Sequence, residues 1–436
     1  MPRAFRRGGT IFRSPRRFSH TVEEAGPERR RSPRRWLTPC ASSTRGASMS
    51  LWQRLRDWIQ PAPPAAKPPE QVSICEEPAH PSPEFNRRFT TSLRSADPSQ
   101  TRRRTRSGRL RQRGLPVWRC DDDVAQALGL SLSELYHFAC HRLADPHLHY
   151  VRFTIPKRGG EERPILAPKP RLKAIQRDLL ELALHQLPVH RAAHAFLPGR
   201  SIATHARPHL QREFLLTLDL HNFFGALHVG RVRGFLMAMG YGWEVASTLA
   251  LLCTEAPRQA VLVHGERLYT PTASRSLPQG APTSPMLANA IVCRLDRRLS
   301  GLARSLGLNY TRYADDLTFS GDDPTRIASV MRLTHQIIAE EGFELATAKT
   351  RIQRRGQRQQ VTGVVVNQTP GAPRARRRRL RAAIHRYAQA CSRGEDDPLR
   401  RRQLEGELAF IHMLNPAQAR ALAAGLPDGP PVANAR

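Results

Sequence analysis

Acidic residues are scarce in this sequence, with 37 Asp and Glu against 69 Lys and Arg, which gives a formal net charge of +32 at pH 7. Lysine is scarcer still, because nearly every basic residue is an arginine and the lysines are only Lys67, Lys157, Lys169, Lys173 and Lys349. The charge excludes a protein with an acidic surface and indicates a polyanionic partner, since each cation laid against a phosphate releases a condensed counterion. A single arginine says little here, whereas a lysine is informative because the two cations are not interchangeable.

Cysteine is also sparse and unpatterned, with seven residues and no C-x-x-C spacing. This pattern excludes a disulfide scaffold and a zinc finger, and it fits small apolar residues in a reducing cytosol. No stretch approaches the roughly 20 apolar residues that a membrane-spanning helix needs. The hydrophobic fraction of 40% is enough for a sizeable core. We therefore expect a cytoplasmic protein with one large folded body and extensions.

Residues 1–115 are rich in Arg, Pro and Ser and have few β-branched side chains. Such a segment cannot bury enough surface to offset its ordering entropy, so we expect a basic extension that is mostly disordered. An apolar face at 51–59 predicts one short helix within it. Met49 lies directly before that helix, which leaves open whether translation starts at Met1 or at Met49.

Beyond the extension, the patterns change to helices and strands. Residues 116–150 hold two helical patterns separated at Gly129, which predict a small helical segment or, alternatively, a helix-turn-helix that reads DNA. Short β-prone runs then alternate with helical ones; strands are expected at 151–155, 163–166, 214–220, 310–320 and 360–367, and helices at 172–187, 230–252, 285–306 and 325–341. From Arg374 the sequence is helical, very basic at first, and without a strand signal. The alternation predicts an α+β fold with a sheet covered by helices on one side.

Two adjacent acids lie between β-prone residues in the segment Tyr313-Ala314-Asp315-Asp316. A hairpin there places the two carboxylates at its tip, where they point to opposite faces. Neighbouring anions repel each other, and two hard oxygens favour Mg²⁺, which takes carboxylates together with substrate phosphates. Alone, an Asp-Asp pair in a turn indicates no more than a solvated loop.

A third acid, Asp219, lies near the end of the apolar run 214–220. A buried carboxylate without a partner would cost several kcal/mol there, so a charge at this position requires a reason. If Asp219 and Asp315 share two cations roughly 3.5–4 Å apart, they form a clamp that activates a 3′-type hydroxyl and holds a leaving pyrophosphate in line. Phe224, five residues on, would then lie beside the sugar, where its ring excludes a 2′-hydroxyl and selects deoxynucleotides.

The third motif is a loop before a helical pattern, Ser276-Leu-Pro-Gln279-Gly280-Ala-Pro-Thr-Ser-Pro285. Gly280 permits a close backbone approach, and Pro285 fits the first turn of a helix. Such a loop can support a nascent base pair by its shape, although alone it is no more than a proline-rich connection.

Together and in this order, the three motifs resemble the reverse transcriptase family, whose palm carries an aspartate after an apolar strand, an L-P-Q-G loop and a Y-x-D-D hairpin. Further segments resemble the bacterial retron branch: Ile155-Pro-Lys157, the run 163–176, Ala195-Phe-Leu-Pro-Gly-Arg200-Ser201-Ile202, Val361-Thr362-Gly363 and the run 404–416. One position departs from that branch, since its N-A-x-x-H signature reads His205-Ala206-Arg-Pro-His209 here, with His in place of Asn. The resemblance covers about residues 118–425.

The resemblance implies a right-hand polymerase of fingers, palm and helical thumb, with a ferredoxin-like antiparallel sheet in the palm. It places the fingers and palm at 151–366 and a basic helical thumb at 367–436. It also implies two Mg²⁺ ions held by Asp219, Asp315 and Asp316, with the backbone of Leu220 as a further ligand.

The same resemblance assigns the residues around this centre. Gln279 and Gly280 would contact the incoming nucleotide and its templating partner, and Lys349 would give a proton to pyrophosphate. The triphosphate would meet one or two of four residues in the fingers: Lys157, Arg163, Lys169 and Arg171. His209 would take part in recognising the cognate RNA, and the thumb arginines would grip the duplex backbone: Arg374, Arg376, Arg377, Arg378, Arg379 and Arg381.

By this resemblance, the chain copies part of a structured non-coding RNA into single-stranded DNA that stays linked to the RNA (msDNA), starting from a 2′-hydroxyl of that RNA and using dNTPs. A role in antiphage defence, with an effector protein, follows from the same branch. Two alternatives remain: another bacterial reverse transcriptase of group II intron or abortive-infection type, and a catalytically silent nucleic-acid-binding protein. The tail has no ribonuclease H pattern and no intron-type zinc or endonuclease signature, and the latter absence disfavours the intron type.

Overall fold

The computed structural model describes residues 104–139, 145, 147–156, 160 and 162–427. All of them fall within one compact unit of the chain, Ala79–Arg436. The apolar stretch 51–59, both candidate start methionines and Lys157 lie outside the described residues. Among the helices in the described ranges, none combines the length and the apolar character needed to cross a membrane.

A four-stranded antiparallel sheet forms the centre of the described part. Its order is β6-β7-β3-β8, with bounds Asn309–Tyr313 for β6, Asp316–Gly321 for β7, Phe214–Asp219 for β3 and Arg351–Arg354 for β8. Helices connect β3 to β6 and β7 to β8, so the chain follows a β-α-β-β-α-β path. The predicted α+β class is confirmed.

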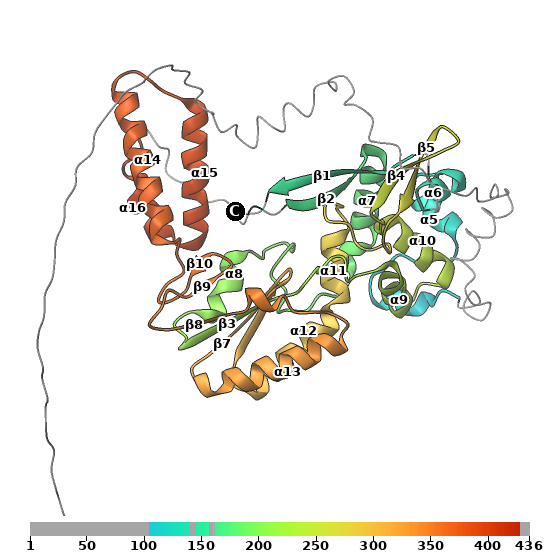
Figure 1. Ribbon diagram of the computed structural model, residues 1–436, viewed down its shortest axis with the longest axis horizontal. Helices are drawn as coiled ribbons and strands as arrows, with labels where there is room; N and C mark the ends of the chain where they lie inside the picture. Colours follow the sequence, from blue (N-terminus) through green and yellow to red (C-terminus); the bar gives the residue numbers. More distant parts are fainter. Residues whose placement is uncertain (1–103, 140–144, 146, 157–159, 161, 428–436) are drawn as a thin grey trace, which may run out of the picture. The chain divides into compact units, whose positions relative to one another are not determined.

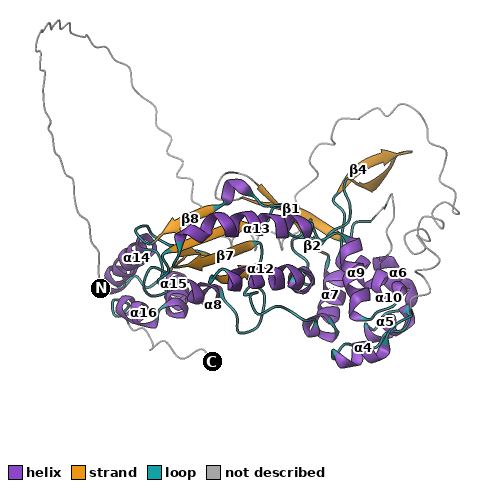
Figure 2. Cartoon of the chain, turned by 90° about the horizontal axis from the view of Figure 1, so that it is seen from below, coloured by secondary structure: helices purple, strands orange, loops and turns teal. Residues whose placement is uncertain are grey.

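The other described elements are helices, short 3₁₀ turns and two-stranded hairpins (Figures 1 and 2). The helices are α4 (Ser107–Gln112), α5 (Asp121–Ala127), α6 (Leu132–Ala139), α7 (Pro170–Leu182), α8 (Ile202–Ala206), α9 (Val229–Met239), α10 (Trp243–Cys253), α11 (Ser284–Ile291), α12 (Cys293–Ser305), α13 (Ile327–Glu340), α14 (Arg374–Ser392), α15 (Pro398–Leu414) and α16 (Pro416–Ala423). Short 3₁₀ turns lie at Leu184–Gln186, Arg207–His209, Pro324–Arg326 and Thr347–Lys349. Two-stranded hairpins are formed by β1 (Tyr150–Pro156) with β2 (Glu162–Pro168), by β4 (Arg258–Val263) with β5 (Glu266–Pro271), and by β9 (Gln360–Val361) with β10 (Val364–Val365).

The central strand β3 separates two cores. Phe214, Leu216 and Leu218 are buried in the main core, which also contains residues of α12 and α13, two helices that lie side by side (Figure 1). Leu215 points the other way and joins a second core with residues of α8, the β9–β10 hairpin and the C-terminal helices. Because strand side chains alternate between faces, Asp219 shares the face of Leu215, at the end of the strand that stays partly accessible.

The chain path differs from the sequence prediction at several elements. No strand was predicted at β8, and the helical run predicted at 285–306 is the two helices α11 and α12. The hairpin β4–β5 falls in a region for which no strand was predicted; its strands are largely exposed, so they lack the one-sided apolar pattern that identifies a strand. Its tight turn at His264 and Gly265, both with positive φ, is the signal that could have located it. The helical run predicted at 230–252 is two helices, because Gly240 at φ +132° ends α9.

The helix α4 packs near Gly240, and the helices α5 and α6 pack against α10. α4 lies inside the segment 1–115 that was expected to be mostly disordered, and its Leu110 is fully buried beside Gly240. The N–H of Arg106 donates to the carbonyl of Gly240 at 2.7 Å. α5 and α6 form at the two predicted helical patterns and both contact α10. The eight residues of α6 include no Lys or Arg, so they offer no cation to a DNA backbone.

Two buried histidines contact hydroxyl side chains of β6 and β7. His209 is fully buried, with Nδ1 at 2.7 Å from the hydroxyl of Ser320 and Nε2 at 2.7 Å from that of Thr311. His205, where the retron signature has Asn, places Nδ1 at 2.8 Å from the same Thr311 hydroxyl. Burial lowers the pKa of His209 to about 3 and that of His205 well below its ordinary value. His209 therefore braces the sheet as a neutral ring, and the structure does not place it on a surface that RNA could reach.

Replacing His209 with Gln should make the free energy of unfolding fall less as the pH is lowered. The unfolded chain protonates this ring near pH 6.5 while the folded chain keeps it neutral down to about pH 3, so across that window the unfolded state binds more protons and stability falls as the pH falls. The drop in unfolding free energy between pH 7 and pH 5 should shrink by about 2 kcal/mol in the variant. Urea denaturation at the two pH values measures it. His335→Gln, at an exposed histidine of α13, is the control; an equal effect there would contradict the assignment.

Candidate active site

β6 and β7 are joined by a two-residue turn at Ala314 and Asp315. The strand register closes on the pair Tyr313–Asp316, and Ala314 takes a φ of +57°, a left-handed conformation that is uncommon for a residue with a Cβ. β7 in turn pairs with β3 so that Asp316 lies opposite Asp219. The Cα atoms of such opposed residues are roughly 4.5–5.5 Å apart. The structure thus brings together the three acids that the sequence singled out.

The three carboxylates repel one another. Burial and then the charge of Asp219 raise the pKa of Asp315 above its ordinary value. Burial and then the charge of Asp315 raise the pKa of Asp316 to about 7, although the Thr318 hydroxyl donates to its Oδ1 at 3.3 Å. Burial and the neighbouring carboxylate thus both disfavour the ionised form of these two acids.

Lys349 is the cation that contacts this centre directly. Its Nζ lies 2.7 Å from Oδ1 of Asp219. Two backbone hydrogen bonds hold the segments together: the N–H of Leu220 donates to the carbonyl of Asp315 at 3.0 Å, and the N–H of Ala346 donates to the carbonyl of Asp219 at 2.8 Å. Leu220 and Lys349 are therefore at the site, as predicted, each from a different side of Asp219.

A divalent cation fits these donors. Carboxylates are the ligands that Mg²⁺ takes beside substrate phosphates, and a bound cation would remove the repulsion that helps to raise the pKa of Asp315 and Asp316. Asp219 is turned to Lys349 in the structure, and the described residues include no group of three or more His, Cys, Asp or Glu side chains already arranged around one point. The ammonium of Lys349 thus contacts Oδ1 of Asp219, an oxygen that could otherwise bind a metal ion.

The loop before α11 is fixed against β2. The N–H of Leu166 donates to the carbonyl of Gln279 at 2.8 Å, and the Ser284 hydroxyl donates to the carbonyl of Pro278 at 2.8 Å. Gly280 has a φ of +128°, and a Cβ on it would lie 2.8 Å from the carbonyl oxygen of Leu166. A glycine is required at 280 both by its conformation and by this approach.

The predicted residues of the fingers occupy different surroundings. Arg163 is exposed on β2, and its charge lowers the pKa of Asp315 against the effect of burial, so it is electrostatically close to the acids. Arg171 pairs with Glu134 of α6 at 3.4 Å, which engages its guanidinium with the N-terminal helices. Lys169 is exposed just before α7. The charge of Arg163 therefore acts on the acids, whereas Arg171 is engaged elsewhere.

Phe224 is half-buried on the main core. Its ring meets that of Phe223 edge to face with centroids 5.3 Å apart, and Phe223 stacks on Phe343 at 6.1 Å. These contacts fix the ring five residues beyond Asp219, while its action on the sugar stays a prediction.

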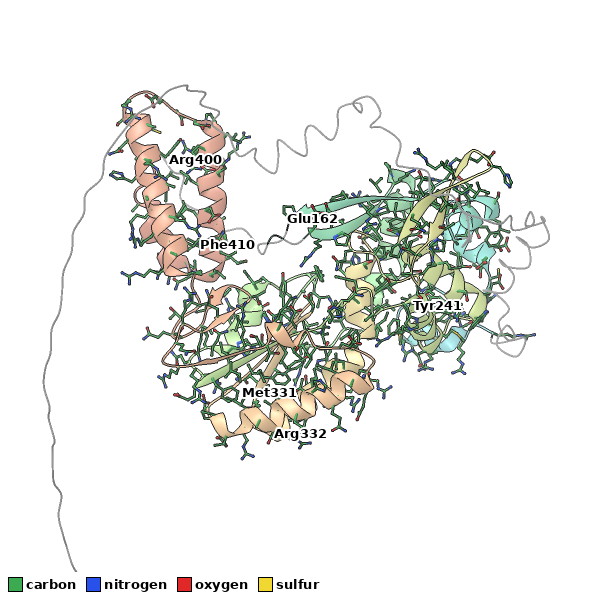
Figure 3. The ribbon with its side chains drawn as sticks, in the orientation of Figure 1. Glu162, Tyr241, Met331, Arg332, Arg400 and Phe410 are labelled. Carbon is green, nitrogen blue, oxygen red and sulfur yellow. The ribbon has the colours of Figure 1, made fainter. Side chains whose placement is uncertain are left out.

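The arginines of α14 divide into two groups. Arg376 is bound inside the helical tail: its Nε and Nη2 donate to the carboxylate of Glu407 at 2.8 and 3.0 Å, and its guanidinium lies 3.8 Å over the ring of Phe410, a residue of α15 (Figure 3). Arg377 is half-buried beside it. The exposed members, which a nucleic-acid backbone could reach, are Arg374, Arg378, Arg379 and Arg381.

A buried ion pair behind the turn was not predicted. Arg312 and Asp296 are both fully buried, and Nε and Nη2 of Arg312 donate to the two carboxylate oxygens at 2.8 and 2.7 Å. Its Nη1 donates to Oδ1 of Asn289 and to the carbonyl of Ala314, each at 3.1 Å. Asn289 lies on α11 and Asp296 on α12, so one guanidinium ties the Ala314 turn to the helices that follow the 276–285 loop.

Comparison with known proteins settles the family. Residues 155–367 match the family model described as reverse transcriptase (RNA-dependent DNA polymerase). The retron Mx65 reverse transcriptase of Myxococcus xanthus is 50% identical over 340 residues, which cover 78% of this chain and 79% of that protein. The chain belongs to the retron reverse transcriptases. This retron reverse transcriptase is also similar to the retron Mx162 enzyme of Myxococcus xanthus (45% identity; 74% of this chain, 70% of the relative) and the retron Ec86 enzyme of Escherichia coli (34%; 64% and 81%).

As a retron reverse transcriptase, the chain is an RNA-directed DNA polymerase, as predicted. Enzymes with this domain use divalent metal ions.

Gly280→Ala should impair incorporation. The new Cβ would meet the Leu166 carbonyl oxygen at 2.8 Å and Cγ2 of Ile165 at 2.9 Å, so the loop must move away from β2. We expect kcat/KM for dNTPs to fall at least about tenfold, or about 1.4 kcal/mol, in primer extension. Gly301→Ala in α12, where nothing lies within 4 Å of the new Cβ, is the matched control and should behave as wild type. Wild-type kinetics in Gly280→Ala would show that the close approach is dispensable.

Arg312→Lys should slow catalysis while leaving template binding intact. The ammonium keeps the buried charge but cannot reproduce the fork that reaches Asp296, Asn289 and Ala314 together. We expect a loss of about 1–3 kcal/mol in unfolding free energy and a lower kcat at unchanged primer-template affinity. Arg332→Lys, at an exposed residue of α13 (Figure 3), is the control. Reduced stability with a normal kcat would mean that the pair stabilises the core without positioning the turn.

Proposed function

We propose that this enzyme copies part of a structured non-coding RNA into single-stranded DNA that stays joined to the RNA, starting from a 2′-hydroxyl of the same RNA. The observation that carries the polymerase chemistry is the strand register that opposes Asp219 and Asp316, with Asp315 on the adjoining turn. The 50% identity to a retron enzyme over most of both chains supports the choice of the retron product over that of other bacterial reverse transcriptases.

In this proposal the chain forms a right hand. The palm is the β6-β7-β3-β8 sheet, whose order and path are those of a ferredoxin-like fold. The fingers comprise the β1–β2 hairpin with α7, and the thumb comprises α14, α15 and α16. The four exposed arginines of α14 would lie along the phosphates of the template duplex, where each contact releases a counterion.

Asp219, Asp315 and Asp316 would hold two Mg²⁺ ions, with the backbone of Leu220 beside them; when bound, the ions supply the charge that activates the attacking hydroxyl and stabilises the leaving pyrophosphate. Gln279 and Gly280 would border the nascent base pair, because the loop is rigidly held against β2. Arg163 would orient the triphosphate, and Phe224 would exclude the 2′-hydroxyl of a ribonucleotide. Lys349, already within 2.7 Å of Asp219, would give a proton to pyrophosphate.

The structured RNA would be primer, template and bound partner at once. The DNA product stays attached to it, so the complex would persist after synthesis. We further propose that this complex acts in antiphage defence together with an effector protein, as the retron assignment implies.

Asp315→Asn should abolish incorporation and preserve RNA binding. The amide removes the charge on the turn without changing its size, so the fold and the RNA-binding arginines stay intact. Full-length wild type and variant are expressed with the RNA from the neighbouring locus, purified, and the bound nucleic acid is sequenced. Wild type should carry DNA branched from a 2′ position of the RNA, and the variant the RNA alone.

Asp178→Asn, at an exposed acid of α7, is the matched control and should yield the branched product. DNA synthesis by Asp315→Asn would refute the assignment of the acids. Unbranched DNA from the wild type would leave the polymerase in place and refute the retron product.

A further inference from the structure

A basic cavity lies at the start of β6, at the opposite end of that strand from the catalytic turn. Its volume is about 600 Å³, and its walls come from residues 191–208, the C-terminal part of α12 and the first residues of β6. Four arginines from separate places in this wall line it: Arg191, Arg200, Arg207 and Arg304. None of the lining residues is Asp or Glu.

The four guanidinium groups are exposed, and within the described residues no hydrogen bond, ion pair or ring contact engages their side chains. Arg312 and Arg376, by contrast, are held by carboxylates. Four like charges around one cavity repel one another, so the folded chain keeps them together at a cost that an anion would remove.

The charge of Arg200 also acts on His194, another lining residue. This lining residue is buried, and burial followed by the charge of Arg200 lowers its pKa to about 4. The C-terminal end of α12 also reaches the cavity and contributes a negative partial charge of roughly half a unit. Against four full positive charges, that contribution leaves the cavity strongly electropositive.

The lining indicates which part of a polyanion would lie here. Tyr310 and His194 both have rings in the wall, and both are buried. Tyr310 lies tilted against Phe319 with centroids 4.8 Å apart and donates its hydroxyl to Asp296 at 2.9 Å, and His194 lies tilted against His205 with centroids 5.7 Å apart. Neither ring presents an open face for a nucleobase. The Thr204 hydroxyl is engaged by Ser201 and His194, and the other lining side chains include the hydroxyl of Ser300. Guanidinium groups and hydroxyls without a stacking platform suit phosphates and sugars rather than bases.

The cavity is separate from the acids but connected to them by one strand. β6 runs from Asn309, in the cavity wall, to Tyr313, next to the turn. The four steps between these five residues, at roughly 3.4 Å each, place the two ends about 14 Å apart. Thr311, midway, lines the cavity and also bonds His205 and His209, so the brace behind the sheet forms part of this wall.

We propose that this cavity binds consecutive backbone phosphates of a nucleic-acid strand outside the active site, giving the enzyme a second grip in addition to the proposed thumb. The binding chemistry depends on the four arginines alone. Only the identity of the strand, the retained RNA or the DNA product, rests on the proposed function, because both carry the same phosphates.

The test uses the full chain with all four arginines changed to Gln (Arg191, Arg200, Arg207 and Arg304), and a second variant with Arg200→Gln and Arg304→Gln only, in case the first does not fold. Anisotropy with labelled oligouridylate and oligothymidylate of equal length measures affinity across a salt series. The fourfold variant should bind at least about tenfold more weakly, with a salt slope shallower by about two to three units, as expected for four lost contacts to a single strand. The double variant should show about half the change in slope.

The matched control carries the same charge change at exposed arginines elsewhere, namely Arg104, Arg111, Arg119 and Arg332 changed to Gln. Weakening confined to the cavity variants supports the proposal, and the oligonucleotide that is affected identifies RNA, DNA or both. Equal weakening in the control, or none in the cavity variants, overturns it. Primer extension at saturating template should remain normal in the cavity variants, so failure here is distinct from the loss of synthesis that tests the acids.

Discussion

Mutual repulsion among Asp219, Asp315 and Asp316 is the constraint around which this structure is organised. Three anions gathered on one partly buried surface would separate if the backbone allowed it. The antiparallel register of β3 and β7, the hydrogen bond from Leu220 to Asp315 and the turn at Ala314 together prevent that. The sheet therefore holds the acids together, and burial followed by their mutual repulsion raises the pKa of Asp315 and Asp316.

The buried pair of Arg312 and Asp296 also helps to hold the turn that carries the acids. Moving two charges into a protein interior costs several kcal/mol per ion, and hydrophobic residues of similar size often stabilise a core as well. Here the guanidinium donates to both oxygens of a carboxylate, to an amide oxygen and to the carbonyl of Ala314. The hydrogen bond to Ala314 reaches the residue of the turn that has a left-handed backbone. The buried pair therefore stabilises a backbone geometry that is unfavourable for a residue with a Cβ.

The sequence allowed the main strands and the three acids to be predicted because each carries a local signal: an apolar run ending in Asp219, a β-prone run interrupted by two acids, and a glycine between prolines. β8 was missed because its four residues are mostly exposed and polar, and their strand conformation comes from pairing with β3. Arg312 was hidden among many arginines, since composition cannot distinguish a buried cation from a solvated one. The burial of His209 depends on partners about a hundred positions away, Thr311 and Ser320, which no local pattern reveals.

The bond between Leu166 and Gln279 joins a strand of the β1–β2 hairpin to the loop that begins α11. Gly280 also approaches the carbonyl of Leu166 closely, so the two segments meet at two points. A displacement of β2 away from the loop would break the hydrogen bond and open the packing at Gly280 together, so strand and loop are mechanically coupled.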